Sequence, residues 1–136
     1  WGDILPEIAP RRGIAGTVID GVCRDVAMCL KLGYPVFAKD HWMRTGKDRV
    51  QVEAYQQPVS LGDVRVCPGD LLVGDADGIV VVPRLRMQEV LLRALATREV
   101  EEQILQAALA GMPLTEARKK FKYHTLQRSD ASTLAA

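Results

Sequence analysis

The chain has 136 residues, of which 48% are hydrophobic and 26% are charged, and its formal net charge is +1 at pH 7. This length suits one domain with a buried core, and the composition is that of an ordinary globular protein. The near-neutral charge gives no electrostatic reason to expect direct binding to nucleic acid or to an anionic membrane surface. No apolar run approaches the roughly 20 residues that a membrane-spanning helix needs. No signal peptide is visible and the three cysteines show no CxxC spacing, so we expect reduced thiols and a cytoplasmic protein.

A short helix is the first element expected. Asp3 is placed to cap it, Pro6 suits its first turn, and apolar residues recur over 4–9. Free backbone N–H groups at such a helix start can receive a carboxylate or a phosphate, although capping alone is the simpler explanation. The run 10–13 then ends the helix before a strand expected over 14–19.

Residues 16–25, with the sequence GTVIDGVCRD, form the stretch around which we expect the chemistry to be organised. The β-branched run at 17–19 predicts a buried strand, and the residues at 20–21, Asp-Gly, predict a turn. Arg24 and Asp25 then begin a helical pattern. In α/β proteins, ligands bind at the carboxyl ends of strands. The pair would supply there a fixed cation and a carboxylate able to hold a metal, unless both are first-turn helix residues with ordinary surface partners.

Gly33 is expected to end this helix, and a second buried strand is expected over 34–38. The three elements would form a β-α-β crossover with parallel strands and right-handed connectivity. A charged loop over 39–49 follows. It contains four basic residues, namely Lys39, Arg44, Lys47 and Arg49. With Trp42 and His41, these residues could form an anion-binding lid or an interface, or the segment could simply be a solvated loop.

From residue 50 the apolar pattern changes to period two, which predicts a β-rich half of the chain. Strands are expected over 50–55, 59–61, 64–67, 71–73 and 79–82. The short connections between them contain Gly-Asp, Pro-Gly-Asp and Asp-Ala-Asp-Gly, which predict antiparallel hairpins. The last of these lacks the continuation and the distal Glu of a calcium loop, so a hairpin turn is the better interpretation.

The remainder of the chain is predicted to be helical. A long amphipathic helix is expected over 85–109, followed by a break at 111–113 and a short helix over 116–121 that Thr115 could cap. Tyr123 and His124 could pack on a neighbouring subunit or cover a pocket, and packing is the simpler explanation. We predict a single domain over 1–128 and a flexible tail over 129–136.

Taken together, these segments resemble the RraA-like family, which includes 4-hydroxy-4-methyl-2-oxoglutarate aldolases, oxaloacetate decarboxylases and a regulator that inhibits ribonuclease E. The resemblance runs from Trp1 to about residue 127. It rests on an ordered series of motifs: GDIL at 2–5, RGIAGTVIDG at 12–21, RD at 24–25, PVF at 35–37, PV at 58–59, PGD at 68–70, DG at 77–78 and VP at 82–83. It implies a layered β/β/α domain of the swivelling-domain kind, with a β-α-β unit, a β-hairpin half and C-terminal helices.

The resemblance also implies a divalent-metal-dependent lyase that cleaves a 2-oxo acid, either by aldol cleavage to pyruvate or by decarboxylation of oxaloacetate. In the family's aldolases a Gly-Asp-x-Leu loop binds a substrate carboxylate through backbone amides, a role that falls here on Gly2, Asp3, Ile4 and Leu5. Arg24 would contact the pyruvoyl part of the substrate, and Asp25 would reach a Mg²⁺ or Mn²⁺ ion, often through waters. Such reactions leave a pyruvate enolate, whose oxygen needs a cation nearby.

Two features depart from the family's pattern. Position 28 is Met28, where the aldolases often carry a second acidic residue near the metal, and the family's N-terminal portion does not precede the Gly-Asp loop. Both favour the alternative function, a non-catalytic regulator that binds a ribonuclease or another protein partner. By resemblance we expect a homotrimer or hexamer with sites at the subunit interfaces.

Overall fold

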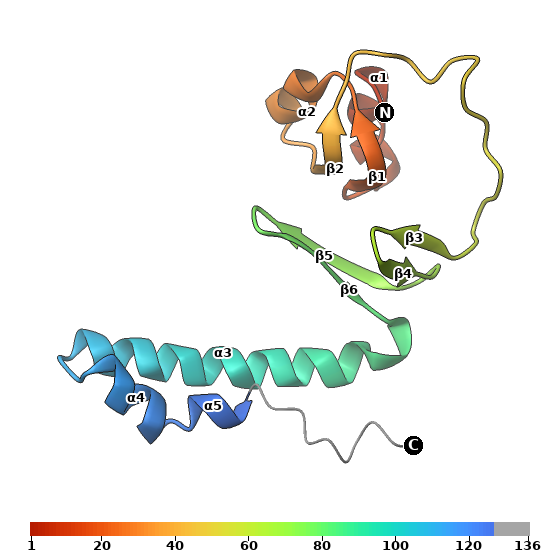
Figure 1. Cartoon of the computed structure of the whole chain (residues 1–136). Coiled ribbons are helices and arrows are strands. Elements are labelled where there is room, and N and C mark those ends of the chain that lie inside the picture. Colours follow the sequence, from red (N-terminus) through yellow and green to blue (C-terminus); the bar gives the residue numbers. More distant parts are fainter. Residues whose placement is uncertain (127–136) are drawn as a thin grey trace. The chain divides into compact units, whose positions relative to one another are not determined.

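The computed structural model describes residues 1–126, which belong to two compact units, Trp1–Arg84 and Leu85–Ala136 (Figure 1). The flexible tail predicted for 129–136 lies outside the described residues. Within the described part, no helix has both the length and the apolar character needed to cross a membrane.

The first unit begins with α1 (Ile4–Ile8) and a single 3-10 turn, η1 (Pro10–Arg12). The predicted cap is confirmed, because the Asp3 carboxylate accepts a hydrogen bond from the Ile4 N–H at 3.0 Å. Gly13 ends the turn with a φ of +72°, a conformation that glycine adopts at little cost. The short α1 packs against α2 (Val26–Leu32), the helix of the following β-α-β unit.

The predicted β-α-β unit is confirmed. Strand β1 (Thr17–Cys23) pairs in parallel with β2 (Val36–His41), and α2 connects them (Figure 1). Gly33 follows α2 at a φ of +62°, and its N–H bonds to carbonyls of the last helical turn, as the sequence predicts.

The turn predicted at Asp20 and Gly21 is wrong, because β1 continues through both residues. From Ile19 to Val22 the chain advances three residues on β1 while its partner β2 advances two, which is a β-bulge. Gly21 does not take the positive φ that the expected turn would use. Pairing with β2 satisfies the backbone of β1 and so overrides the local turn preference of Asp-Gly.

Two antiparallel hairpins follow, as predicted. They pair β3 (Val59–Leu61) with β4 (Val64–Val66), and β5 (Leu71–Asp75) with β6 (Gly78–Val82). The strand predicted over 50–55 is wrong, since this segment has no regular secondary structure. Val50 and Val52 are 77% and 86% exposed, and among the described residues no strand pairs with this segment to complete a ladder. An alternating pattern needs a partner strand before it becomes a strand itself.

Side chains connect these elements within the first unit. The Asp20 carboxylate forms an ion pair with Lys39 and accepts the Gly62 N–H at 3.1 Å, which joins the bulge of β1 to the β3–β4 turn. The Lys39 hydrogen bond is the main reason that the pKa of Asp20 is lowered. On β2, the Phe37 ring lies so close to Gly74 of β5 that a Cβ there would be 2.6 Å from it.

The second unit contains α3 (Met87–Leu109), α4 (Leu114–Lys120) and α5 (Tyr123–Leu126), and a 3-10 turn, η2 (Arg84–Arg86), precedes α3 (Figure 1). The long helix begins and ends close to the predicted residues. Helix α4 starts earlier than predicted, so Thr115 lies inside it and no side chain caps it. Ile104 of α3 and Ala117 of α4 are buried where the two helices contact.

Candidate active site

The two motifs singled out in the sequence lie side by side in the structure. The Asp3 N–H donates a hydrogen bond to Oδ2 of Asp25 at 3.1 Å, across 22 residues of sequence. The Arg24 N–H donates to the Trp1 carbonyl at 3.3 Å, next to the same loop. The loop before α1 and the connection from β1 to α2 therefore form one polar site.

Gly2 allows the Arg24 side chain to lie directly against this loop. A Cβ added at Gly2 would be 2.6 Å from Nη2 of Arg24 and 2.9 Å from its Nε. No real side chain tolerates contacts that short without a shift of its neighbour. Glycine is therefore needed at this position so that the Arg24 guanidinium can lie close to the loop. The reason is space and not backbone conformation, because Gly2 does not have a positive φ.

Asp25 adopts the left-handed backbone conformation, with φ +58° and ψ +35°, in the residue before α2. Aspartate is one of the few residues that enter this region readily. The Oδ2 atom lies 3.5 Å from Nη1 of Arg24, and the two side chains are 39% (Arg24) and 37% (Asp25) exposed. Within residues 1–126, no hydrogen bond involves Oδ1 of Asp25, which leaves this oxygen available to a ligand.

The backbone amides expected to bind a carboxylate already have partners within the loop. The Ile4 N–H bonds to the Asp3 carboxylate at 3.0 Å, and the Leu5 N–H bonds to the Gly2 carbonyl at 3.2 Å. The Asp3 N–H bonds to Asp25. A substrate carboxylate at this loop would therefore have to replace an internal acceptor.

The donor atoms at the site suit a hard cation that keeps most of its waters. Across residues 1–126, no group of three or more His, Cys, Asp or Glu side chains is arranged to hold a metal. Mg²⁺ usually takes only one or two carboxylates and retains several waters. The Asp25 carboxylate fits that requirement, whereas a cage made only of protein ligands is not present among these residues.

Met28 lies in the first turn of α2, and its N–H donates to the Asp25 carbonyl at 3.0 Å. Its side chain lines a groove of about 330 Å³ together with Asp3 and residues of α1 and η1 (Ile4, Glu7, Ile8 and Arg11). Met28 therefore lies beside the site, as its spacing from Asp25 predicts, but offers no oxygen ligand. No sequence pattern predicted the groove itself, because its lining comes from three separate elements.

Two of the basic residues expected in the loop over 39–49 have partners of their own. Lys39 belongs to β2 and pairs with Asp20, while the Arg44 guanidinium lies 4.4 Å from the centre of the Trp42 ring. His41 ends β2 and lies beside Asp40.

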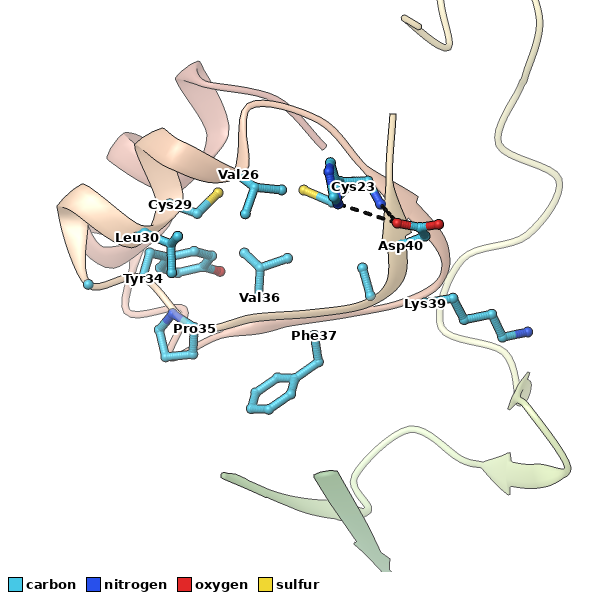
Figure 2. A pocket seen from close by; sticks show the side chains of 13 residues that line it. Cys23, Val26, Cys29, Leu30, Tyr34, Pro35, Val36, Phe37, Lys39 and Asp40 are labelled. Atoms are coloured by element: carbon cyan, nitrogen blue, oxygen red, sulfur yellow. Dashed lines mark hydrogen bonds and ion pairs between the residues drawn. The ribbon is translucent and has the colours of Figure 1, made fainter. Parts of the chain in front are cut away.

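A second hollow, of about 580 Å³, lies between α2 and β2 (Figure 2). Figure 2 shows Cys23, Cys29 and Val36 around this hollow, with the Phe37 ring directed away from them. The two cysteines are free and buried, and burial is the main reason that the pKa of the Cys29 thiol is raised. A raised pKa disfavours the reactive thiolate, which agrees with the expectation of reduced, structural thiols.

Comparison with known proteins identifies the family. Residues 1–81 match the model of the RraA-like family, described as Aldolase/RraA. This chain belongs to the RraA-like family, as the motifs in the sequence predict.

Relatives of known sequence agree with this assignment. The chain is 40% identical over 123 residues to protein DlpA of Legionella pneumophila, a match that covers 90% of this chain and 20% of that protein. It is 38% identical over 93 residues to a Halalkalibacterium halodurans protein named "Putative 4-hydroxy-4-methyl-2-oxoglutarate aldolase", which covers 68% of this chain and 44% of that protein.

Solved structures confirm the α/β fold. An uncharacterised protein from Pseudomonas syringae pv. tomato superposes with a TM-score of 0.85 at 42% identity, over 88% of this chain and 56% of that one. Streptomyces coelicolor RraAS2, described as an unusual member of the RNase ES inhibitor RraA protein family, gives a TM-score of 0.68 at 37% identity, over 74% of this chain and 52% of that one. The chain thus spans about half the length, or less, of the proteins that it matches.

Proposed function

We propose that this chain carries the substrate- and metal-binding part of a divalent-metal-dependent lyase that acts on a 2-oxo acid. The reaction is either aldol cleavage of a compound of the 4-hydroxy-4-methyl-2-oxoglutarate type to pyruvate, or decarboxylation of oxaloacetate. The observation that carries the proposal is the hydrogen bond from the Asp3 N–H to Asp25, which joins the Gly-Asp loop to the Arg-Asp pair. Relatives named as aldolases support the same class of reaction.

Both reactions break a bond to carbon 3 of a 2-oxo acid and place negative charge on the oxygen of carbon 2. Arg24 carries a permanent charge in a planar fork of N–H donors, which suits a carboxylate or an oxyanion. It lies against the loop in the space that Gly2 leaves free and is about two-fifths exposed, so a small anion can reach it. Asp25 would hold a bound Mg²⁺ or Mn²⁺, which would act as the Lewis acid for the developing charge.

The whole active site is proposed to include more than this chain. The chain matches only about half of its relatives' length, and large apolar side chains of α1 are exposed: Ile4, Leu5 and Ile8 are 67%, 46% and 42% exposed. Exposed apolar patches mark interaction surfaces. We therefore propose a homotrimer or hexamer in the cytoplasm, with the acid–base group supplied from outside the described residues.

The test is pyruvate release from oxaloacetate and from 4-hydroxy-4-methyl-2-oxoglutarate, coupled to lactate dehydrogenase. Each substrate is assayed with Mg²⁺, with Mn²⁺ and with EDTA, after correction for decarboxylation by the free metal. We expect metal-dependent release that Arg24→Ala and Asp25→Asn each abolish while thermal unfolding stays close to that of the wild type. Undiminished release in Arg24→Ala would contradict the proposal.

A second candidate function is a non-catalytic regulator that binds a ribonuclease or another protein. Met28 favours it, because this side chain lies beside Asp25 and offers no metal ligand. A regulator of this kind would assemble normally and show no metal dependence. Thermal unfolding with millimolar Mg²⁺ or Mn²⁺ distinguishes the two, since a ligand that binds only the folded state raises the melting temperature. An unchanged melting temperature favours the regulator.

A further inference from the structure

We infer that Asp25 competes with the substrate carboxylate for the same donors, so that a divalent cation and a 2-oxo acid bind cooperatively. The inference rests on the proposed function and assigns Asp25 a second role, as an internal competitor of the substrate. These donors, called the anion site below, are the Asp3 N–H and the Arg24 guanidinium.

A carboxylate already lies in the anion site. The Oδ2 atom of Asp25 accepts the Asp3 N–H at 3.1 Å and lies 3.5 Å from Nη1 of Arg24. An amide of the Gly-Asp loop and an arginine are the two kinds of donor that the family resemblance assigns to the substrate. While Asp25 accepts the Asp3 N–H, a substrate carboxylate cannot accept the same N–H, and beside Arg24 it would be repelled by the negative charge of Asp25.

The local backbone directs Asp25 into this position. Its left-handed conformation, with φ +58°, follows the end of β1 and precedes α2. The neighbouring Ile4 and Leu5 N–H groups donate to acceptors within the loop. Of these three N–H groups, the one of Asp3 is therefore the one that donates to Asp25. Because Gly2 has no side chain, the Arg24 guanidinium can lie against the loop as the second donor of the anion site.

The Asp25 carboxylate is accessible to a cation that could draw it away from the anion site. Among residues 1–126, no hydrogen bond involves its Oδ1 atom, and its side chain is 37% exposed. When Asp25 binds a divalent cation, its charge is neutralised and its hold on the Asp3 N–H and on Arg24 weakens. The anion site then becomes available to the substrate. By linkage, the cation raises the affinity for the 2-oxo acid and the 2-oxo acid raises the affinity for the cation by the same factor.

The test is a calorimetric titration with pyruvate, which binds without turnover, in EDTA and in Mg²⁺. Asp25→Gly empties the anion site and suits the positive φ, while Asp25→Asn keeps an oxygen acceptor and tolerates the same backbone. In EDTA we expect Asp25→Gly to bind pyruvate about three- to tenfold more tightly than the wild type. The reason is that pyruvate no longer has to replace the exposed, charge-assisted hydrogen bond between the Asp3 N–H and Asp25. Mg²⁺ should tighten pyruvate binding in the wild type and leave Asp25→Gly unchanged.

Two controls separate this inference from the proposed function. Asp25→Asn should lie between the wild type and Asp25→Gly in EDTA, and adding Arg24→Ala to Asp25→Gly should remove the gain. Pyruvate binding of equal or lower affinity in Asp25→Gly, with normal binding in the wild type, would overturn the inference and leave the proposed site standing. An absence of pyruvate binding in every variant, with and without Mg²⁺, would overturn both.

Discussion

A Gly2→Ala substitution would place a methyl group against the side chain of Arg24. The added Cβ would lie 2.6 Å from Nη2, 2.9 Å from Nε and 3.0 Å from Cζ. Backbone strain adds nothing, because Gly2 does not have a positive φ. The guanidinium must therefore move by roughly 1 Å to regain an ordinary van der Waals separation.

We expect this displacement to weaken anion binding much more than folding. The guanidinium is the far end of a flexible side chain that is 39% exposed, so the free energy of unfolding should change by less than about 1 kcal/mol. A hydrogen bond to a charged group contributes about 1.5–3 kcal/mol. If it is lost, the affinity for pyruvate should fall by roughly 10- to 150-fold.

The assay is a calorimetric titration with pyruvate in Mg²⁺, accompanied by thermal unfolding of each variant. Gly21→Ala is the matched control, because Gly21 also lacks a positive φ and its added Cβ would lie 3.7 Å from Ile19, which is ordinary contact. The control should bind pyruvate as the wild type does. Wild-type affinity in Gly2→Ala would refute the reasoning that Arg24 must stay against the loop.

Three further predictions concern other positions. Two backbone N–H groups lower the pKa of Asp70 from its ordinary 3.8, so its stabilisation is present above that pH and is lost as the pH falls through the lowered pKa. Between pH 7 and pH 3, the midpoint of urea unfolding should therefore fall further in the wild type than in Asp70→Asn. An equal fall in the two proteins would contradict this. Met28→Asp adds a carboxylate three residues after Asp25 and should raise Mn²⁺ affinity on the order of tenfold, or about 1.4 kcal/mol, whereas Met28→Leu should not. Gly74→Ala would bring a Cβ to 2.6 Å from the rigid Phe37 ring and should cost about 1–3 kcal/mol of stability. In chemical denaturation, adding Phe37→Leu should recover part of that loss, and strict additivity would argue against the contact.

Local sequence signals predicted much of the framework. Asp3 caps α1, Gly33 ends α2, and both hairpins close where the turn residues stand. These features depend on residues that are close along the chain, and their preferences act through backbone conformation and short hydrogen bonds. Two of the wrong predictions, the turn at 20–21 and the strand over 50–55, concern segments whose state depends on a partner strand.

The candidate site shows the same division. Residue types and spacing were enough to select Arg24 and Asp25, while the family resemblance added Gly2 and Asp3 and supplied the roles proposed for all four. The sequence could not reveal that Asp25 would bond to the Asp3 N–H, or that Met28 would share a groove with residues of α1. Neither contact follows from local preference.

By itself, the sequence determined α1, α2, α3, both hairpins and the family, and it selected the candidate site residues, because each depends on local preference or on an ordered series of motifs. Only the tertiary structure decided that β1 bulges, that Arg24 lies against Gly2 and that the carboxylate of Asp25 takes the anion site. The physical reason is that a hydrogen bond across 22 residues forms only after β1, α2 and α1 have packed, and that packing fixes which of several available donors each acceptor meets.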